Sequence, residues 1–248
     1  MYFMGDNMQL TISHDLSEDL DLPLNYHHMI QGIVYHSLSD MPEYSRFVHD
    51  QGYDFSDRQY RMFVYGLLQG KYEIKGKRII FKDHISFQVR SPEVSFIRLL
   101  KESIEKNGIT YFQKRYDSVN LFMDNYVIKE DCIKIQMQSP ICVYSTNADT
   151  GKTYFYAPDE EEFYNAINDN FIRKYTAYMG IEPKTVLDIK PVRVTPRDKM
   201  VTKYKGIYLS GWKGVYELYG DTEYLNFLYN TGLGSKNSQG FGLFDVLS

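Results

Sequence analysis

The chain has 248 residues and a formal charge of −4, with 43% hydrophobic and 24% charged residues. A chain of this length can bury one large core or two smaller ones, and this composition excludes an intrinsically disordered protein. Cys132 and Cys142 are too few for a disulfide framework or a zinc site, and no apolar run is long enough for a signal peptide or a membrane span. We therefore expect a cytoplasmic protein without membrane association.

Acidic and basic residues are unevenly distributed along the chain. Residues 1–60 carry ten acids and two bases, whereas residues 61–90 and 184–205 each carry seven bases and two acids. Two basic stretches in an acidic chain predict a local binding face for an anionic partner. The alternative, which charge counting by itself favours, is that these stretches form an ordinary solvated surface.

The first half of the chain predicts strands and helices in the order strand, helices, strands, helix, strand. Apolar spacing and turn residues place a strand at 8–13, helices at 24–38 and 43–49, strands at 61–68, 71–75, 77–81 and 84–89, a helix at 92–106 and a strand at 119–128. Lys75-Gly76 indicates a tight hairpin turn. Pro92 is typical of a helix start and Gly108 of a helix end.

The second half repeats this order. The expected elements are strands at 132–144, 185–195, 206–218 and 241–247, with helices at 159–178 and 221–229. Two successive β-α-β-β-α-β orders predict an α+β protein of tandem ferredoxin-like domains. We place the N-terminal domain at residues 1–129 and the C-terminal domain, with its glycine-rich loop, at residues 130–248.

The glycine-rich loop near the C-terminus is the most specific segment of the sequence. Residues 232–242 read GLGSKNSQGFG, which lacks the Gly-Lys-Ser/Thr of a P-loop and the third glycine of a dinucleotide-binding fingerprint. Its glycines permit positive φ and close backbone approach, so free amides and Lys236 are able to cradle an anion. The alternative is a bare turn that leads into the final strand.

This loop and several other segments carry a resemblance to a known family. Gly232–Gly242, followed by Leu-Phe-Asp-Val, resembles the C-terminal signature of the CRISPR-associated repeat-RNA endoribonucleases. Weaker matches agree in order along the chain: Leu22-Pro-Leu-Asn-Tyr, Gln31-Gly-Ile-Val-Tyr35, Phe47-Val-His-Asp-Gln-Gly52, Arg61-Met-Phe-Val-Tyr65 and Gln138-Ser-Pro-Ile-Cys-Val143. The resemblance therefore spans nearly the whole chain, and the family's fold of two ferredoxin-like domains agrees with the order of predicted elements.

The resemblance implies an endoribonuclease that binds and cuts CRISPR repeat RNA without a metal or other cofactor. Family members cut by attack of the neighbouring 2′-OH, which leaves a 2′,3′-cyclic phosphate and a 5′-OH. His49 matches the usual catalytic histidine and Tyr35 the second participant, while Arg61 stands closest to a third role that is often a lysine. Because an arginine does not act as an acid near neutral pH, Arg61 is expected only to stabilise phosphate charge. The sequence has no carboxylate pair or His/Cys cluster at metal-ligand spacing.

The glycine-rich loop is expected to bind RNA through its flexible glycines and its polar side chains, namely Gly232, Gly234, Lys236, Asn237, Ser238, Gly240 and Gly242.

In the helix expected at 24–38, helical spacing places Tyr35, Gln31 and His28 on one face, opposite Ile30, Ile33 and Val34.

Several alternatives to this assignment stay open. Arg58 is a possible substitute for Arg61, and His27, His28 or His36 for His49, whereas His14 and His84 are expected at the surface. The rival functions are a non-catalytic guide-RNA-binding subunit of a CRISPR ribonucleoprotein, and a structural subunit that recruits other proteins through an acidic face in residues 1–60. A small-molecule sensor is disfavoured by the loop. The sequence does not define the repeat or the oligomeric state.

Overall fold

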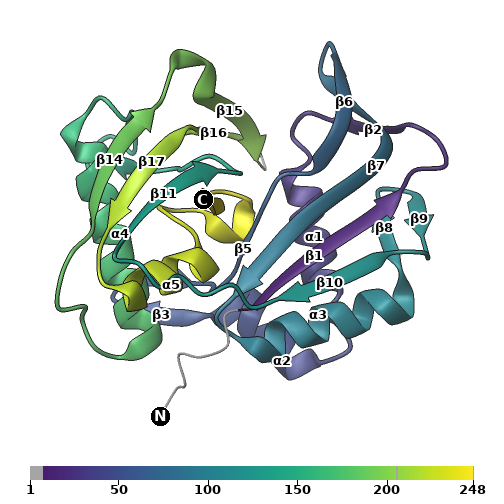
Figure 1. Ribbon diagram of the computed structural model, residues 1–248, viewed down its shortest axis with the longest axis horizontal. Helices are drawn as coiled ribbons and strands as arrows, with labels where there is room; N and C mark the ends of the chain where they lie inside the picture. Colours follow the sequence, from purple (N-terminus) through teal and green to yellow (C-terminus); the bar gives the residue numbers. More distant parts are fainter. Residues whose placement is uncertain (1–7, 205, 248) are drawn as a thin grey trace.

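A computed structural model of the protein describes residues 8–204 and 206–247 (Figure 1). It has a mixed α/β fold with many strands and few helices. The helical elements are α1 (His27–His36), α2 (Pro42–Arg46), η1 (Phe47–Gln51, a π-helical turn), α3 (Val94–Asn107), α4 (Glu161–Met179), η2 (Pro196–Asp198), α5 (Thr222–Thr231) and η3 (Asn237–Gln239). In the described residues, no helix is both long enough and apolar enough to cross a membrane.

The strands form two larger antiparallel sheets and several small hairpins. In chain order they are β1 (Met8–Asp15), β2 (Leu20–Pro23), β3 (Tyr53–Phe55), β4 (Arg58–Tyr60), β5 (Val64–Tyr65), β6 (Gln69–Lys75), β7 (Arg78–Ser91), β8 (Ile109–Tyr111), β9 (Lys114–Tyr116), β10 (Asn120–Asp124), β11 (Cys132–Met137), β12 (Tyr144–Thr146), β13 (Thr153–Phe155), β14 (Asp188–Arg193), β15 (Lys199–Tyr204), β16 (Ile207–Trp212), β17 (Val215–Tyr219) and β18 (Phe244–Leu247).

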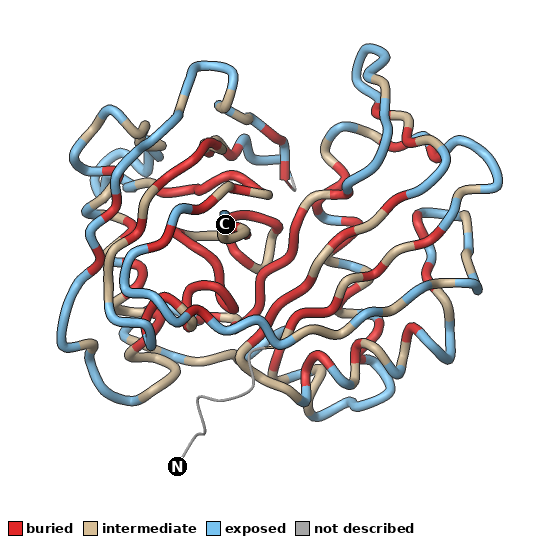
Figure 2. Tube along the Cα trace, viewed as in Figure 1, coloured by how far each residue is buried: buried red, intermediate tan, exposed pale blue. Residues whose placement is uncertain are grey.

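The first sheet has the strand order β10-β1-β7-β2, and β5 and β6 also pair with β7. Leu10, Ile12 and Phe87 on its two central strands are buried on one face, because successive strand side chains point to opposite faces. Ile30 of α1 and Ile97 of α3 belong to the same apolar core. The core of the first half therefore lies between this sheet and its helices (Figure 2).

The second sheet has the strand order β14-β17-β11-β18. Its buried residues Ile135 and Leu218 share an apolar core with Phe163 and Ile167 of α4 and with Leu225 of α5. Gly180, in the left-handed conformation, ends α4 as the sequence predicts. The second half thus repeats the arrangement of one antiparallel sheet with two helices packed on its core.

A buried arginine ties the two halves together. Arg90, near the end of β7, donates to Gln9 Oε1, to the Phe244 carbonyl and to Asp245 Oδ1, each at 2.5 Å. Its guanidinium carbon lies 3.8 Å from the centre of the Tyr229 ring. A buried guanidinium is tolerated when its donors are satisfied, so this network fastens the last strand of the second sheet to the first sheet.

Several expectations about strands are wrong in detail, and of the strand expected at 61–68 the structure forms only β5. The segments at 77–81 and 84–89 belong to one long strand, β7, which continues through Asp83 at a φ of +62°. The single strand expected at 206–218 is two strands, β16 and β17, and β16 pairs with β15, which the sequence analysis missed. The turn signal for this hairpin was present, because Gly206, at a φ of +91°, directly precedes β16, as Gly76 marks the turn between β6 and β7.

Candidate active site

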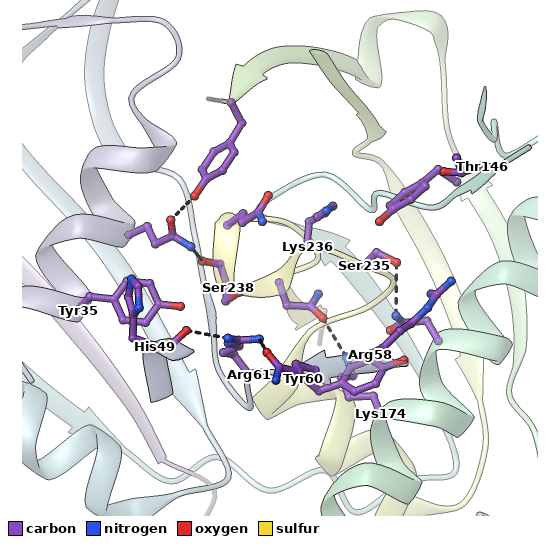
Figure 3. Close-up of a pocket in the computed structure, with 17 residues that line it drawn as sticks. Tyr35, His49, Arg58, Tyr60, Arg61, Thr146, Lys174, Ser235, Lys236 and Ser238 are labelled. Atoms are coloured by element: carbon purple, nitrogen blue, oxygen red, sulfur yellow. Dashed lines mark hydrogen bonds between the residues drawn. The ribbon is translucent and has the colours of Figure 1, made fainter. Parts of the chain in front are cut away.

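The two halves enclose a cleft of about 690 Å³ (Figure 3). Its walls come from α1, η1 and β4 in the first half, and from β12, α4, β15 and the glycine-rich loop in the second. No Asp or Glu is among the described residues that line it, whereas the lining includes Arg58, Arg61, Lys174 and Lys236. In a chain with 32 acidic residues, this segregation makes the cleft a region of positive potential.

His49 and Tyr35 contact each other at one side of the cleft. Tyr35 lies near the C-terminal end of α1 and His49 in the π-helical turn η1, which ends at Gly52. The ring centroids are 4.8 Å apart and the ring planes are inclined by 71°, an edge-to-face contact (Figure 3). The structure thus brings together the two residues that the resemblance marks as catalytic, and His49 lies on a π-helical turn, which is often found at functional sites.

Asp50 orients the imidazole of His49. Its Oδ1 lies 2.5 Å from His49 Nδ1, and the His49 and Asp50 side chains are 59% and 62% exposed. A carboxylate at this position favours the proton on Nδ1 and leaves Nε2 for exchange with a substrate. The sequence analysis missed Asp50, although its position directly after the candidate histidine was a usable signal.

Arg61 holds the π-helical turn in place. Its Nη2 donates to the His49 carbonyl at 2.6 Å and its Nε to the Val48 carbonyl at 3.3 Å. Burial raises the pKa of Tyr35, an effect that the nearby Arg61 guanidinium opposes, so the phenol stays protonated near neutral pH. Arg61 therefore places a positive charge beside Tyr35 and also fixes the backbone of His49.

The glycine-rich loop is docked onto the helix that carries Tyr35. Gln31 of α1 donates from Nε2 to the Ser238 carbonyl at 2.6 Å and accepts a hydrogen bond from the Tyr204 hydroxyl. Lys236, at a φ of +65°, has its Nζ 5.4 Å from the centre of the Tyr144 ring. The loop is thus part of the cleft wall, with the side chains of Lys236 and Ser238 at its surface.

The interior of the loop is closely packed. Asn237 is buried, and its Nδ2 donates to the carbonyls of Leu233 at 3.1 Å and Phe241 at 3.0 Å. A Cβ on Gly242 would lie 2.0 Å from the Leu233 carbonyl oxygen, so only glycine fits there. Gly232, Gly234 and Gly240 are also buried in this packing. The buried Asn237 and the closely packed glycines therefore fix the shape of the loop, whereas Lys236 and Ser238 face the cleft.

The alternative histidines lie outside the cleft lining. His27 is 1% exposed, has its Nδ1 3.4 Å from the Gln239 carbonyl, and burial lowers its pKa to about 4. His28 and His36 are exposed, and His28 pairs with the Asn25 carbonyl. Of the predicted helix face, Gln31 and Tyr35 reach the cleft but His28 does not.

His14 corrects another expectation. It was expected at the surface, but it is 1% exposed and its ring packs 4.3 Å from the centre of the Tyr116 ring. Strand alternation places His14 on the same face as the buried Leu10 and Ile12, so the sequence did contain a signal for its burial. His84, by contrast, is exposed as expected.

The first basic stretch is largely neutralised by ion pairs. Its bases pair at the surface as Lys71 with Asp83, Lys75 and Lys82 with Glu73, and Arg78 with Asp21. These contacts favour the solvated-surface interpretation of residues 61–90, apart from Arg61 in the cleft and the buried Arg90. Lys205, at the end of the second stretch, lies outside the described residues, as do residues 1–7 of the expected acidic face.

Two polar residues of α4 that the sequence analysis missed also line the cleft. Lys174 is buried and bonded to the end of α5 and to the loop. Asn170 donates from Nδ2 to Ser235 Oγ at 3.3 Å. Helical spacing was a usable signal for both, because Asn170 and Lys174 fall three and seven residues after the buried Ile167, on the same face of the helix.

The cleft can perform proton transfer and stabilise negative charge. His49 supplies an imidazole, Tyr35 a hydroxyl, and the surrounding cations an environment for phosphate. The described residues contain no group of three or more His, Cys, Asp and Glu side chains able to hold a metal ion. A positive cleft with these groups is typical of proteins that act on the backbone of nucleic acid.

Comparison with known proteins identifies the family. Residues 123–246 match the family model described as CRISPR associated protein Cas6, C-terminal, which covers half of the chain. The chain therefore belongs to the Cas6 family of CRISPR-associated repeat-RNA endoribonucleases.

Individual relatives extend the likeness to nearly the whole chain. This chain is 24% identical over 241 residues to the CRISPR-associated endoribonuclease Cas6 of Pyrococcus furiosus, and the alignment covers 95% of this chain and 87% of that protein. The endoribonuclease Cas6 1 of Methanocaldococcus jannaschii is 22% identical, covering 97% and 93%. A solved structure of a Cas6-related protein from P. furiosus has a TM-score of 0.80 at 20% identity, covering 98% and 99%, and therefore shares the fold.

Proposed function

We propose that this protein is a metal-independent endoribonuclease that cuts CRISPR repeat RNA by attack of a 2′-OH on the adjacent phosphodiester. The observation that carries the proposal is the contact between His49 and Tyr35 within a cationic cleft that no described carboxylate lines. The named activity of the relatives agrees with it. The products are an upstream fragment with a 2′,3′-cyclic phosphate and a downstream fragment with a 5′-OH.

The reaction needs one proton removed and one proton supplied. The 2′-oxygen loses its proton as it bonds to phosphorus, and the 5′-oxygen gains a proton as its bond to phosphorus breaks. His49 is the general acid or base through Nε2, since Asp50 engages its Nδ1. Tyr35 orients the 2′-OH or the phosphate, and Arg61 stabilises the charge that accumulates on the phosphate oxygens.

We further propose that each half is a ferredoxin-like domain, with the boundary near residue 129. The strand orders β10-β1-β7-β6 and β14-β17-β11-β18 are each compatible with a β-α-β-β-α-β unit. The two apolar cores, one in each half, support the same division. The cleft would then lie between two domains of one architecture.

The glycine-rich loop is proposed to bind the RNA backbone. Lys236 and Ser238 line the cleft beside Tyr35, and Gly232, Gly234, Gly240 and Gly242 permit the tight path that presents them. Asn237 contributes by shaping the loop, because its amide is occupied inside it. The expected contact with RNA is therefore through phosphate, which positions the strand without reading its bases.

The test separates an enzyme from a non-catalytic guide-RNA-binding subunit. Wild-type protein and His49→Ala are each incubated with a labelled repeat RNA, and binding and cleavage are followed in parallel. Binding by both proteins, with cleavage by the wild type alone, supports the proposal. Binding without cleavage by the wild type would assign the protein to the non-catalytic class, and absence of both would favour a structural subunit.

A further inference from the structure

Lys174 is a buried lysine in the wall of the cleft to which the proposed reaction assigns no role. It lies on α4 and is 1% exposed. Its Nζ donates to the carbonyls of Thr231 at 3.3 Å and Gly232 at 2.6 Å, and to Asn237 Oδ1 at 3.0 Å. These partners are carbonyl and amide oxygens, so the described contacts of this ammonium include no carboxylate.

A buried ammonium is costly unless its donors are satisfied, and here burial lowers the pKa of Lys174 to about 7. Two of its partners are carbonyls at the end of α5, where helical hydrogen bonds run out and the helix dipole favours a cation. The third partner belongs to the glycine-rich loop. Lys174 therefore connects α4 to the end of α5 and to the loop at a single atom.

Asn237 carries this connection across the loop. Its Oδ1 accepts a hydrogen bond from Lys174. Its Nδ2 donates to the carbonyls of Leu233 and Phe241, which lie four residues before and four residues after Asn237 in the chain. Lys236 and Ser238, its neighbours in the chain, line the cleft. The Asn237 side chain therefore helps to fix where these two residues are presented, together with the hydrogen bond from Gln31 Nε2 to the Ser238 carbonyl.

We propose that Lys174 is a positioning residue, which acts through Asn237 to hold residues 235–239 in the form that grips an RNA phosphate backbone. The inference rests on the proposed function for the identity of the ligand. The order that Lys174 imposes on the loop is a property of the free protein. Because Lys174 has no described contact with His49 or Tyr35, its effect falls on binding more than on the chemical step.

Lys174→Met removes the ammonium with little change in side-chain length, and Lys236→Met is the matched control that removes a cleft charge without releasing the loop. Hydrogen exchange of the amides in residues 233–241 is measured on the free proteins. We expect faster exchange in Lys174→Met and wild-type exchange in Lys236→Met. Unchanged protection in a folded Lys174→Met would overturn the proposal, whether or not the protein binds RNA.

RNA binding supplies the second readout. In Lys174→Met the Kd for repeat RNA should rise by about tenfold, while the single-turnover cleavage rate at saturating RNA stays near that of the wild type. A variant damaged only in stability would instead lose active molecules at an unchanged Kd. If the wild type itself fails to bind RNA, the proposed function fails and the exchange experiment alone decides the role of Lys174.

A double-mutant cycle tests whether Lys174 acts through the loop. If it does, Lys236→Met should weaken RNA binding much less in a Lys174→Met background than in the wild type. Additive effects would show that the two lysines act independently and would contradict the proposal. Should Lys174→Met not fold, Lys174→Gln, whose amide keeps a donor toward Gly232, takes its place with the same pattern expected at smaller size.

Discussion

The edge-to-face contact between Tyr35 and His49, at 4.8 Å between ring centroids, joins α1 to the π-helical turn η1 at one side of the cleft. Tyr35 also packs edge-to-face on the buried Phe63, with 5.8 Å between centroids. The exposed imidazole is therefore held from one side by an anchored aromatic ring and at Nδ1 by Asp50. Such restraint keeps Nε2 near one orientation, as the proposed proton transfer to a bound RNA would require.

His49→Ala should slow cleavage of repeat RNA by roughly 10²- to 10⁴-fold, because that is the usual contribution of a positioned acid or base. RNA affinity should change little, and single-turnover kinetics with a binding assay measures both. His36→Ala, an exposed histidine outside the cleft lining, is the control. Wild-type cleavage by His49→Ala would remove this residue from the site.

Arg61 and Arg58 should behave differently although both line the cleft. Arg61 bonds the carbonyls of Val48 and His49, so Arg61→Lys, which lacks the forked donors, should lower the cleavage rate by about tenfold or more. Arg58→Met should weaken RNA binding and leave the rate at saturating RNA nearly unchanged. A rate loss confined to Arg58→Met would reverse the two assignments.

The glycine-rich loop should contribute to binding through phosphate contacts. Lys236→Ala should weaken binding similarly for different RNA sequences and reduce the slope of log affinity against log salt by about 0.7. Gly234→Val should be worse, since Gly234 has a φ of +67° and a Cβ there would lie 2.9 Å from the Cys142 carbonyl oxygen. Circular dichroism checks that this variant folds. An unchanged salt slope in Lys236→Ala, with normal affinity in folded Gly234→Val, would show that the loop is a structural turn without a role in RNA binding.

The buried His27 predicts a loss of stability in mild acid. Burial lowers its pKa from 6.5 to about 4, so the unfolded chain takes up a proton that the folded protein excludes. This stability is fully present above pH 6.5 and is lost as the pH falls toward 4, by up to about 3 kcal/mol. Urea unfolding at pH 7.5 and 5 should show a larger loss for the wild type than for His27→Gln. Equal losses would contradict this role of His27.

Much of the element order could be predicted because it depends on local signals. The helix that ends at Gly108, the one that ends at Gly180 and the hairpin at Gly76 all have boundaries set by glycines at positive φ. Gly206, directly before β16, is the same kind of signal for the β15–β16 hairpin, which was not predicted. The burial of His14 could have been inferred from strand alternation and was missed.

The part of the candidate site that could be predicted consists of the residues that match family motifs. Tyr35, His49 and Arg61 lie together in the cleft as the resemblance implied. The roles of Asp50 and Lys174 depend on the geometry of the folded chain, because one faces His49 Nδ1 and the other reaches a loop 63 residues away. Adjacency to His49 pointed to Asp50 and helical spacing to the buried side of Lys174, but the partner of the Lys174 side chain is set by the folded chain.

The most direct test of the central claim is cleavage of repeat RNA in excess EDTA, with end-group analysis of the products. The proposed mechanism predicts cutting at one phosphodiester, with a 2′,3′-cyclic phosphate on the upstream product and a 5′-OH on the downstream one. A single 2′-deoxynucleotide just upstream of the cut should abolish the reaction, because the nucleophile is then missing. Cleavage of that deoxy substrate, or a strict requirement for Mg²⁺, would contradict the mechanism.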